Sequence, residues 1–561
     1  MASERATGTL DGIGMQDHSV TSEYRIVGPP GTGKTTNTGR QVERAVQKYG
    51  PRSVLVTSFS RAAAAELANC DLTVNPDRIG TLHSFCFHAL GKPRIAEAQV
   101  EEWNALHPQL ALTPVKGQCR LDGEDSAEDD SSQRAGDSLL RELNRRRGLM
   151  TNPDGWPGDL VEFERKWSRY KRERGLMDFG DLIDTCLRDV PIAPGKPAVI
   201  FADEAQDLSI MQARLIRKWG SRADYFVMAG DDDQTIYSFI GATPEAFLEP
   251  EIPEDQTVIL RESHRVPRAV HRLANGLIQR VTRRQVKAYF PRPVAGDVQR
   301  VCSGTYKTPE YFILSSAIKH LERGKKVMFL AACSYMLAPI IQVLRKNAIP
   351  FHNPYRKSNG FWNPMRVTSQ SVSRRILALL AAHPAYSEGQ RPWTYHDVIL
   401  WTAVLREEGV LKAGVREVLQ CADGKEPVTI ERLAQLLEPA AFASMMAAFD
   451  SDGPALLDWW RIKVSPSNQS RIQYPASIVV RHGPQALVEE PRVVVGTIHS
   501  VKGGQADVVY LFSDLSRAGD AQYQVAGGPR DSVIRLFYVG ATRARETLYI
   551  CGGATPIAIS F

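Results

Sequence analysis

The sequence lacks the features that mark secreted, membrane-spanning and zinc-binding proteins. Its 8 cysteines are scattered over 561 residues without a Cys-x-x-Cys pair. This pattern indicates neither a disulfide framework nor a zinc site, and it favours a reducing compartment. No run of about 18 apolar residues is present, and residues 1–19 lack the apolar core of a secretory signal. These absences predict a cytoplasmic protein.

A strong charge of one sign is also missing. With 69 basic and 63 acidic residues the formal net charge is +6, a mild excess that is compatible with nucleic-acid binding but does not identify it. A chain of 561 residues is too long for a single hydrophobic core. Its length predicts about three or four domains, which can be interleaved in sequence.

A glycine-rich turn near the N-terminus is the strongest local signal. A short apolar strand leads into Gly28-Pro29-Pro30-Gly31-Thr32-Gly33-Lys34-Thr35-Thr36, and a helix is expected to start at Lys34. Such a loop wraps its backbone N–H groups around phosphates, and the helix N-terminus adds positive charge. Lys34 is expected to contact the β- and γ-phosphates and Thr35 to bind Mg²⁺. A turn without a ligand is the alternative, and the strand before it argues against that.

Polar residues follow further predicted strands. Apolar segments at 53–58 and 197–202 precede Phe59 and the pair Asp203-Glu204, and strands alternate with helices. This order predicts a parallel α/β sheet with ligands at the carboxyl ends of its strands. Asp203 is then expected to hold Mg²⁺, and Glu204 to be the general base for the attacking water.

A strand at 225–229 leads into a segment that combines an amide with two aromatic rings. Gln234 is placed to sense the γ-phosphate, and Tyr237 and Phe239 are candidates for stacking on bases. The alternative is that both rings belong to the hydrophobic core. Between about residues 90 and 190 the pattern becomes helical, and residues 121–138 form an acidic stretch that is expected to be a disordered loop.

Several motifs together resemble those of superfamily 1 DNA helicases of the UvrD/Rep/PcrA type. Besides the phosphate loop, they are Thr57-Ser58-Phe59-Ser60, Gly80-Thr81-Leu82-His83-Ser84-Phe85, Asp203-Glu204-Ala205-Gln206-Asp207, Gly230-Asp231-Asp232-Asp233-Gln234-Thr235-Ile236-Tyr237, Leu260-Arg261-Glu262-Ser263-His264-Arg265, and the segments 493–504 and 537–545. They occur in the family's order and span residues 28–545, which is nearly the whole chain.

The resemblance implies two RecA-like parallel-sheet lobes, each with an inserted, mainly helical subdomain. The first lobe would comprise residues 1–90 and 190–260, with 91–189 inserted. The second would comprise residues 261–365 and 490–561, with 366–489 inserted. Helices are expected at 371–382, 415–421 and 430–437, and a loop at 465–470.

The resemblance also assigns roles to individual residues. Arg265 and Arg543 would contact the γ-phosphate, with Arg543 as an arginine finger, and would act together with Lys34, Glu204 and Gln234. ATP and Mg²⁺ are the implied cofactors. The implied DNA contacts are Phe59, Thr81, His83, Tyr237, Phe239, Thr497 and His499.

Four positions depart from the family pattern. His264 replaces a tyrosine that stacks on adenine, Gln505 replaces a glutamate that touches the ribose, and Phe239 replaces a tryptophan. Ile240 replaces an arginine and so removes one positive charge beside the DNA. Gln16 lies where some relatives read adenine, although a solvated glutamine fits its surroundings equally well.

The sequence therefore predicts an ATP-dependent DNA helicase that moves 3′→5′ on single-stranded DNA, unwinds duplexes and is associated with the nucleoid. Its expected partners are single-stranded DNA, single-strand/duplex junctions and unidentified replication or repair proteins. One alternative is a translocase that strips proteins from DNA and unwinds weakly, motivated by Ile240 and a short second insertion. A second, less favoured alternative is a DNA- and ATP-binding subunit without hydrolysis.

Overall fold

The computed structural model describes residues 23–59, 73–114, 134–356, 363–386 and 391–561. Gln16, Ser60 of the second motif and residues 121–133 of the acidic stretch lie outside the described residues. The chain divides into two compact units. Unit 1 comprises Met1–Tyr306, Phe329–Met336 and Gly496–Phe561, and unit 2 comprises Lys307–Met328 and Leu337–Val495.

The first sheet of unit 1 is parallel throughout and has the strand order β3-β2-β4-β5-β1-β6. Its strands are β1 (Glu23–Val27), β2 (Val54–Ser58), β3 (Ile79–Thr81), β4 (Val199–Asp203), β5 (Tyr225–Gly230) and β6 (Thr257–Ile259). The central strands are almost fully buried and apolar, as in a parallel sheet covered on both faces. The predicted parallel α/β sheet is confirmed.

Helices cover the two faces of this sheet. In β4, Ile200 packs in one hydrophobic cluster and its neighbour Phe201 in another, because successive strand side chains point to opposite faces. The first cluster includes residues of α3 (Leu82–Ala89), α7 (Phe179–Asp189) and α8 (Ile210–Gly220), and the second includes residues of α1 (Lys34–Tyr49). The helix expected at Lys34 is therefore confirmed.

The register of the strands brings the predicted site residues to one edge. Ser58 is level with Asp203 on one side and with Thr81 on the other, and Val27 is level with Gly230. The phosphate loop, Phe59, Glu204 and Asp231 therefore all leave the sheet at its carboxyl edge, where open α/β sheets bind ligands.

Between α3 and α7 the chain forms a helical group with α4 (Glu101–Leu106), α5 (Ala135–Gly148) and α6 (Gly158–Arg174). They share an aromatic core that includes Trp103, Phe163 and Trp167. The expectation of a loop up to residue 138 is wrong for its last residues, because α5 begins at Ala135. Asp137 stabilises that start by accepting a hydrogen bond from the Arg134 N–H at 2.9 Å.

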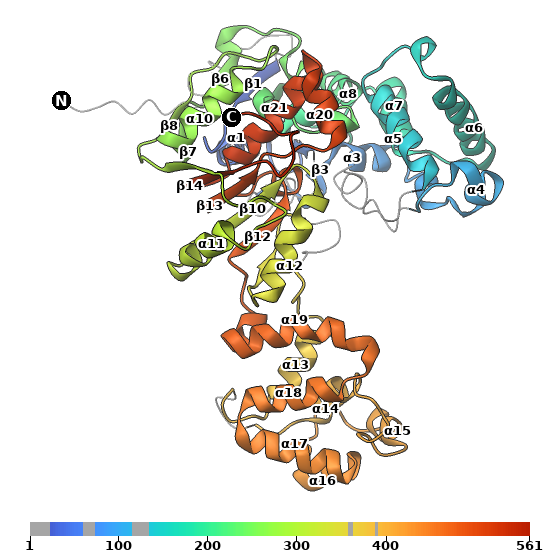
Figure 1. Cartoon of the computed structure of the whole chain (residues 1–561). Helices are drawn as coiled ribbons and strands as arrows, with labels where there is room; N and C mark the ends of the chain where they lie inside the picture. The colour runs from blue at the N-terminus through green and yellow to red at the C-terminus, as the bar shows by residue number, and fades with distance from the viewer. Residues whose placement is uncertain (1–22, 60–72, 115–133, 357–362, 387–390) are drawn as a thin grey trace. The chain divides into compact units, whose positions relative to one another are not determined.

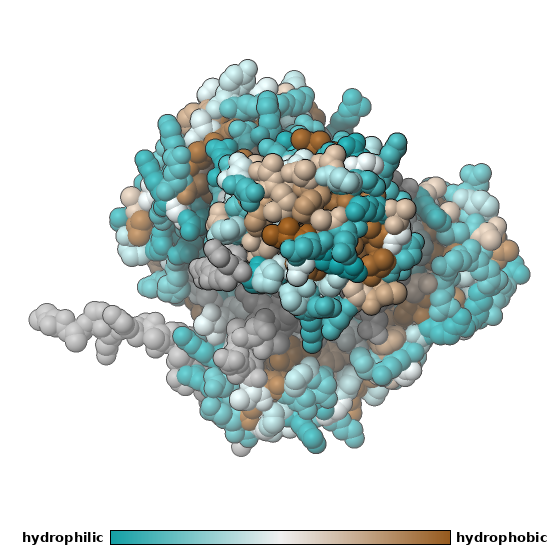
Figure 2. Space-filling model, turned by 90° about the horizontal axis from the view of Figure 1, so that it is seen from below, coloured by the Kyte–Doolittle hydropathy of each residue, from teal (hydrophilic) through white to brown (hydrophobic). Residues whose placement is uncertain are grey.

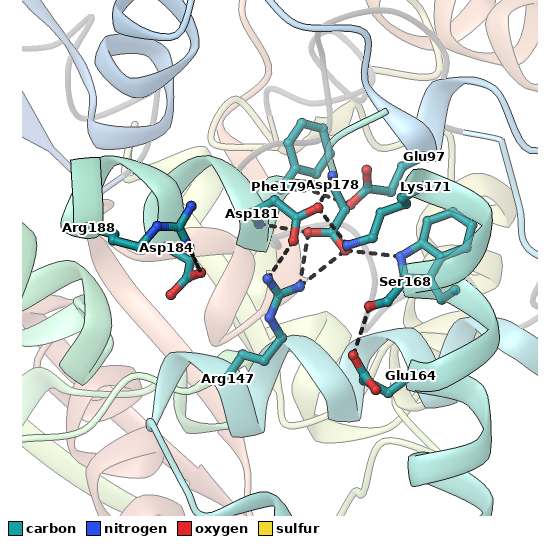
Figure 3. A network of polar contacts seen from close by, with 11 residues as sticks. Glu97, Arg147, Glu164, Ser168, Lys171, Asp178, Phe179, Asp181, Asp184 and Arg188 are labelled. Atoms are coloured by element: carbon teal, nitrogen blue, oxygen red, sulfur yellow. Dashed lines mark hydrogen bonds and ion pairs between the residues drawn. The ribbon is translucent and has the colours of Figure 1, made fainter. Parts of the chain in front are cut away.

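A buried ion cluster joins these helices to α7, and we define it as Arg147, Lys171, Asp178 and Asp181. Arg147 donates to Asp178 at 3.0 Å and to Asp181 at 2.6 Å, and the Lys171 ammonium contacts both carboxylates. The Trp167 indole N–H donates to Asp178 at 3.0 Å. Figure 3 shows the charged groups of α5, α6 and α7 converging on Asp178 and Asp181.

Glu97 lies beside this cluster and accepts a hydrogen bond from the Phe179 N–H at 3.1 Å. Burial, together with the negative charge of Asp178, raises the pKa of Glu97 to about 8, and Lys171 opposes that shift. In the unfolded chain its pKa is about 4.3, so the unfolded state loses this proton first as the pH rises. The contribution of Glu97 to the free energy of unfolding is thus largest below pH ~4.3 and declines until the pH passes about 8. Between pH 5 and 8 we therefore expect the native protein to lose roughly 2–4 kcal/mol of stability relative to Glu97→Gln.

Urea unfolding midpoints at pH 5, 6.5 and 8 measure this effect. Glu101→Gln, a substitution of an exposed residue on α4, is the matched control and should follow the native profile. Parallel profiles for native protein and Glu97→Gln would contradict the buried neutral carboxyl.

A second sheet has the order β11-β12-β10-β13-β14-β9, and its β9–β14, β13–β14 and β11–β12 pairs are parallel. Its strands are β9 (Asp297–Val301), β10 (Val327–Ala331), β11 (Phe351–His352), β12 (Val493–Thr497), β13 (Ala506–Phe512) and β14 (Ala544–Cys551). Of these strands, β9, β13 and β14 belong to unit 1 and β11 belongs to unit 2. Outside this sheet, unit 1 contains β7 (Glu262–Pro267), β8 (Phe290–Arg292), α10 (Arg268–Ile278), α20 (Arg517–Gln524) and α21 (Gly528–Ala541).

Unit 2 is mainly helical, and Figure 1 shows α13 to α19 packed on one another. Its helices are α11 (Phe312–Glu322), α12 (Ala338–Lys346), α13 (Val372–Leu380), α14 (Tyr395–Thr402), α15 (Val415–Gln420), α16 (Ile430–Leu436), α17 (Pro439–Ser451), α18 (Gly453–Lys463) and α19 (Pro466–His482). The three helices expected between 371 and 437 are present. Buried tryptophans stabilise the group, since Trp460 donates to the Trp401 carbonyl at 2.8 Å.

The loop expected at 465–470 is wrong, because these residues start α19. Pro466 occupies its first turn, where the missing N–H of proline is tolerated and its fixed φ favours the helix. Asn468 donates to the Ser465 hydroxyl at 3.0 Å. The polar composition was therefore that of a helix start.

No helix in the described part of the chain is both long and apolar enough to cross a membrane. Figure 2 shows one face of the molecule, on which hydrophobic residues occur as patches between hydrophilic ones.

Candidate functional site

The phosphate loop needs its glycines for close packing. A Cβ at Gly28 would lie 2.7 Å from Lys34 Cβ, and one at Gly31 would lie 2.4 Å from Arg265 Cβ. Gly31 and Gly33 both have a φ of 76°, which favours glycine. Gly33 provides no side-chain cap to α1, so the first N–H groups of that helix suit an anion.

Lys34 and Glu204 face each other across this loop. Lys34 Nζ lies 2.8 Å from Glu204 Oε1, and Gln206 donates to the other carboxylate oxygen. Burial opposes charge on both groups, but their mutual attraction outweighs it. The pKa of Lys34 is therefore raised, and that of Glu204 is lowered to about 2 with help from Lys502. Glu204 is thus ionised at neutral pH, as a general base requires.

The expected magnesium ligands, Thr35 and Asp203, lie at adjoining element ends. Thr35 is the second residue of α1, and Asp203 ends β4 with 2% exposure. Among the described residues, no group of three or more His, Cys, Asp and Glu side chains could hold a metal. Mg²⁺ at phosphates is held by one or two protein oxygens together with the phosphates, so a hydroxyl and a carboxylate fit this ion.

Gln234 connects this edge to the second sheet. Its amide accepts from Arg543 Nη2 at 3.3 Å and donates to Asp231 at 2.8 Å. Arg543 is 1% exposed and also donates to the Val539 carbonyl at 2.9 Å. Burial, and then the charge of Arg265, lower the pKa of Arg543 to about 9, which leaves the guanidinium charged at pH 7.

The segment 263–265 closes over the phosphate loop. The His264 N–H donates to the Gly31 carbonyl at 2.8 Å, and Arg265 Nε donates to Gln505 at 3.1 Å. The His264 side chain is exposed, so its ring is accessible to a flat ligand. The predicted nucleotide residues, including Arg265 and Gln505, thus gather around one loop.

The aromatic candidates form a second group beside Gln234. The Phe59 and Tyr237 rings stack with centroids 5.1 Å apart, and the Phe239 ring meets the His499 ring edge-on at 5.4 Å. Tyr237 is only 2% exposed, whereas Phe59 and Phe239 are half-buried. The core alternative therefore describes Tyr237 in this structure, and the accessible ring surface belongs to the other two.

The remaining DNA candidates are less accessible. Thr81 is 2% exposed and caps α3 through a hydrogen bond from the Ser84 N–H, and Thr497 is 3% exposed and accepts from the Ser500 N–H. Burial lowers the pKa of both His83 and His499 to about 4, so both imidazoles are neutral at pH 7.

Two family models match the chain. Residues 15–252 match the UvrD/REP helicase N-terminal domain, and residues 492–551 match the UvrD-like helicase C-terminal domain. The chain belongs to the UvrD/Rep helicase family. Its two six-stranded parallel sheets are consistent with the two RecA-like lobes of this family.

Individual relatives are distant. "ATP-dependent DNA helicase Rep" of Buchnera aphidicola is 24% identical over 356 residues, covering 59% of this chain and 52% of the relative. "ATP-dependent DNA helicase PcrA" of Staphylococcus epidermidis is 22% identical over 375 residues, covering 63% and 51%. The chain spans about half the length of the curated relatives it matches.

Within this UvrD/Rep framework the structure adds residues that the motifs did not single out. Lys502 donates to the Gln234 carbonyl at 3.1 Å and to the Asp207 carboxylate, and its ammonium lies 5.1 Å from the Tyr237 ring centroid. Lys502 lies in the motif segment 493–504, where a lysine followed by two glycines could have marked it as a candidate site residue.

A second unpredicted group surrounds the aspartates after β5. Lys287 Nζ lies 2.8 Å from Asp231 and 3.1 Å from Asp233, and it also contacts Asp232. Lys287 is almost completely buried, and its pKa is raised because these carboxylates outweigh burial. It thereby compensates the charge of Asp231, which orients the Gln234 amide. No sequence motif marked this lysine.

Tyr289 is the third addition. Its hydroxyl and that of Ser263 both donate to the Pro30 carbonyl, at 2.8 and 2.9 Å. They hold the phosphate loop from the side of Arg265.

Proposed function

We propose that the chain is an ATP-dependent DNA helicase that moves 3′→5′ on single-stranded DNA and unwinds duplexes. The observation that carries the proposal is the position of Gln234, which contacts Arg543 through its amide and Lys502 through its carbonyl and lies five residues from Phe239. One short segment therefore joins a phosphate site to accessible aromatic rings. The names of the Rep and PcrA relatives agree with this reading.

At the nucleotide end, Lys34, Arg265 and Arg543 would contact phosphates, and Thr35 and Asp203 would hold Mg²⁺. The metal supplies charge neutralisation on the β- and γ-oxygens when bound. Glu204 orients the attacking water and accepts its proton. His264 stacks on adenine and Gln505 binds the ribose, while the backbone from Gly28 to Gly33 surrounds the phosphates.

At the DNA end, Phe59 and Phe239 stack on bases and Tyr237 supports them from beneath. Aromatic stacking is independent of sequence, as a motor that passes over every base requires. Thr81, His83, Thr497 and His499 line the same track. Lys502 contacts both the Gln234 backbone carbonyl and the Tyr237 ring, so a movement of the Gln234 backbone on hydrolysis would reach the aromatic group.

A translocase with weak unwinding is the second candidate. Ile240 motivates it, because this half-buried apolar side chain stands beside Phe239 where relatives place a charged residue. Such a protein would hydrolyse ATP on DNA but separate strands poorly.

The test compares steady-state ATP hydrolysis with and without single-stranded DNA, and then strand displacement on duplexes with a 3′ or a 5′ tail. We expect strong stimulation by DNA and displacement from the 3′-tailed duplex only. Stimulation without displacement would select the translocase. Hydrolysis indifferent to DNA would overturn the motor assignment.

Phe239→Ala is expected to raise the DNA concentration needed for half-maximal stimulation about 10- to 100-fold, because stacking on one base contributes roughly 1–3 kcal/mol. The KM for ATP should change less than about twofold, since the Phe239 ring packs against the rings of Tyr237 and His499 in the DNA group. Phe290→Ala, which removes an exposed ring on β8, is the control. If the two variants need the same DNA concentration for half-maximal stimulation, the stacking role of Phe239 is contradicted.

A further inference from the structure

The C-terminal end of α5 packs on the turn that carries Phe239. A Cβ at Gly241 would lie 3.1 Å from the Arg145 carbonyl oxygen, and one at Gly148 would lie 3.1 Å from Ser209 Cβ and 4.0 Å from the Ile240 carbonyl oxygen. A side chain at either position would be tighter than an ordinary contact, and the φ of 96° at Gly241 itself favours glycine. The position of the turn 238–241 is therefore set by a helix outside the sheet.

The N-terminal end of α7 makes a corresponding contact with α3. The Phe179 ring meets the His83 ring edge-on, with centroids 6.3 Å apart. Behind it, α3 and α7 share the first core cluster of the sheet. Thus α5 supports one candidate DNA element, and α7 supports the other.

The buried ion cluster joins these two supports. Arg147 precedes Gly148 on α5 and lies against the first turn of α7, where a Cβ at Gly180 would come 2.9 Å from its Nη1. Asp178 and Asp181 cap that turn reciprocally, because each accepts a hydrogen bond from the other's backbone N–H. Figure 3 shows Arg147 reaching from its helix to both carboxylates.

We infer that the buried ion cluster is a positioning device for single-stranded DNA, which fixes the spacing between the Phe239 turn and the His83 helix. This inference rests on the proposed function. A buried ion pair is weak evidence for stability, because desolvation offsets much of its attraction. Arg147 nevertheless donates through its two terminal nitrogens to two different carboxylates, which restricts how the two helices orient. A ring and an imidazole that bind one strand must keep their spacing.

The decisive experiment measures two constants for Arg147→Met. We expect the half-saturating concentration of single-stranded DNA to rise about tenfold, with the KM for ATP and the DNA-independent rate within about twofold of native. Arg147→Lys, which keeps the charge, should recover part of the DNA affinity. Arg169→Met is the matched control, because this arginine lies on α6 but its side chain is 80% exposed, and it should behave like native protein.

Two outcomes overturn the inference. One is an unchanged DNA constant, and the other is a parallel shift of the DNA and ATP constants, which indicates a general loss of structure. If Arg147→Met does not fold, Phe179→Leu replaces it, since it removes the ring contact with His83 and leaves all four charges in place. It should raise the DNA constant severalfold without changing the KM for ATP, and no change would also overturn the inference.

Failure of the proposed function has a different signature. Native protein would then show no stimulation by DNA, whatever the variants do. If DNA stimulates ATP hydrolysis by the native protein and Arg147→Met has the native half-saturating DNA concentration, only the positioning role is refuted.

Discussion

Arg543→Ala is expected to lower kcat for DNA-stimulated ATP hydrolysis by about 10³-fold or more, the range seen when an arginine finger is removed. Arg543 is buried and donates to Gln234 through the same guanidinium that would stabilise the developing charge on the γ-phosphate. Its loss leaves the amide of Gln234 without this donor. Stacking of DNA on Phe239 should be little affected, so the DNA constant should stay within about threefold.

Two further variants sharpen this result. Arg543→Lys keeps a positive charge but loses the planar fork, and we expect it to remain at least about 100-fold impaired. Arg545 lies two residues away, and its backbone carbonyl, not its side chain, accepts the hydrogen bond from Arg292. The kcat of Arg545→Ala should therefore be close to that of native protein. If steady-state kinetics show a kcat for Arg543→Ala within tenfold of native, Arg543 does not act as the arginine finger.

The sequence correctly grouped several site candidates at the carboxyl edge of the first sheet, for a physical reason. Parallel strands end at one edge, so Lys34, Asp203 and Gln234 could be grouped from their positions after apolar runs. The contact between Arg543 and Gln234 spans 309 positions and was not predicted, and only the family resemblance had assigned Arg543 to the γ-phosphate. Local patterns do not encode such separations.

Burial explains most of what the sequence could not decide. Tyr237 and Phe239 have the same spacing signal, yet one ring is in the core and the other is accessible, because their exposure depends on Phe59, His499 and the packing of α5. Lys287 lay in a basic stretch that reads as a solvated surface. Its three aspartate partners are more than fifty residues earlier in the chain, so its burial was not predictable.

Glu204→Gln is expected to lower kcat by about 10²- to 10⁴-fold, the contribution of a positioned general base. The amide has nearly the same shape, and its oxygen can still accept the hydrogen bond from Gln206. It cannot accept a proton from water. The substitution also removes the charge 2.8 Å from Lys34. Lys34 is then released for a phosphate, so ATP binding should be unchanged or tighter while turnover is lost.

Nucleotide binding measured alongside single-turnover hydrolysis separates these two effects. Glu262→Gln, which changes an exposed carboxyl on β7, is the control and should match native protein in both measurements.

The pH dependence gives an independent check, because the pKa of Glu204 is about 2, below its unfolded value of about 4.3. The stability that its ionised form contributes is present above pH ~4.3 and is lost as the pH falls toward 2. Glu204 is therefore charged throughout pH 5–9, and any decline of native hydrolysis in that range must come from other groups. A kcat for Glu204→Gln within tenfold of native would show that another group accepts the proton, and Asp207, whose pKa burial raises to about 6, would be the next candidate.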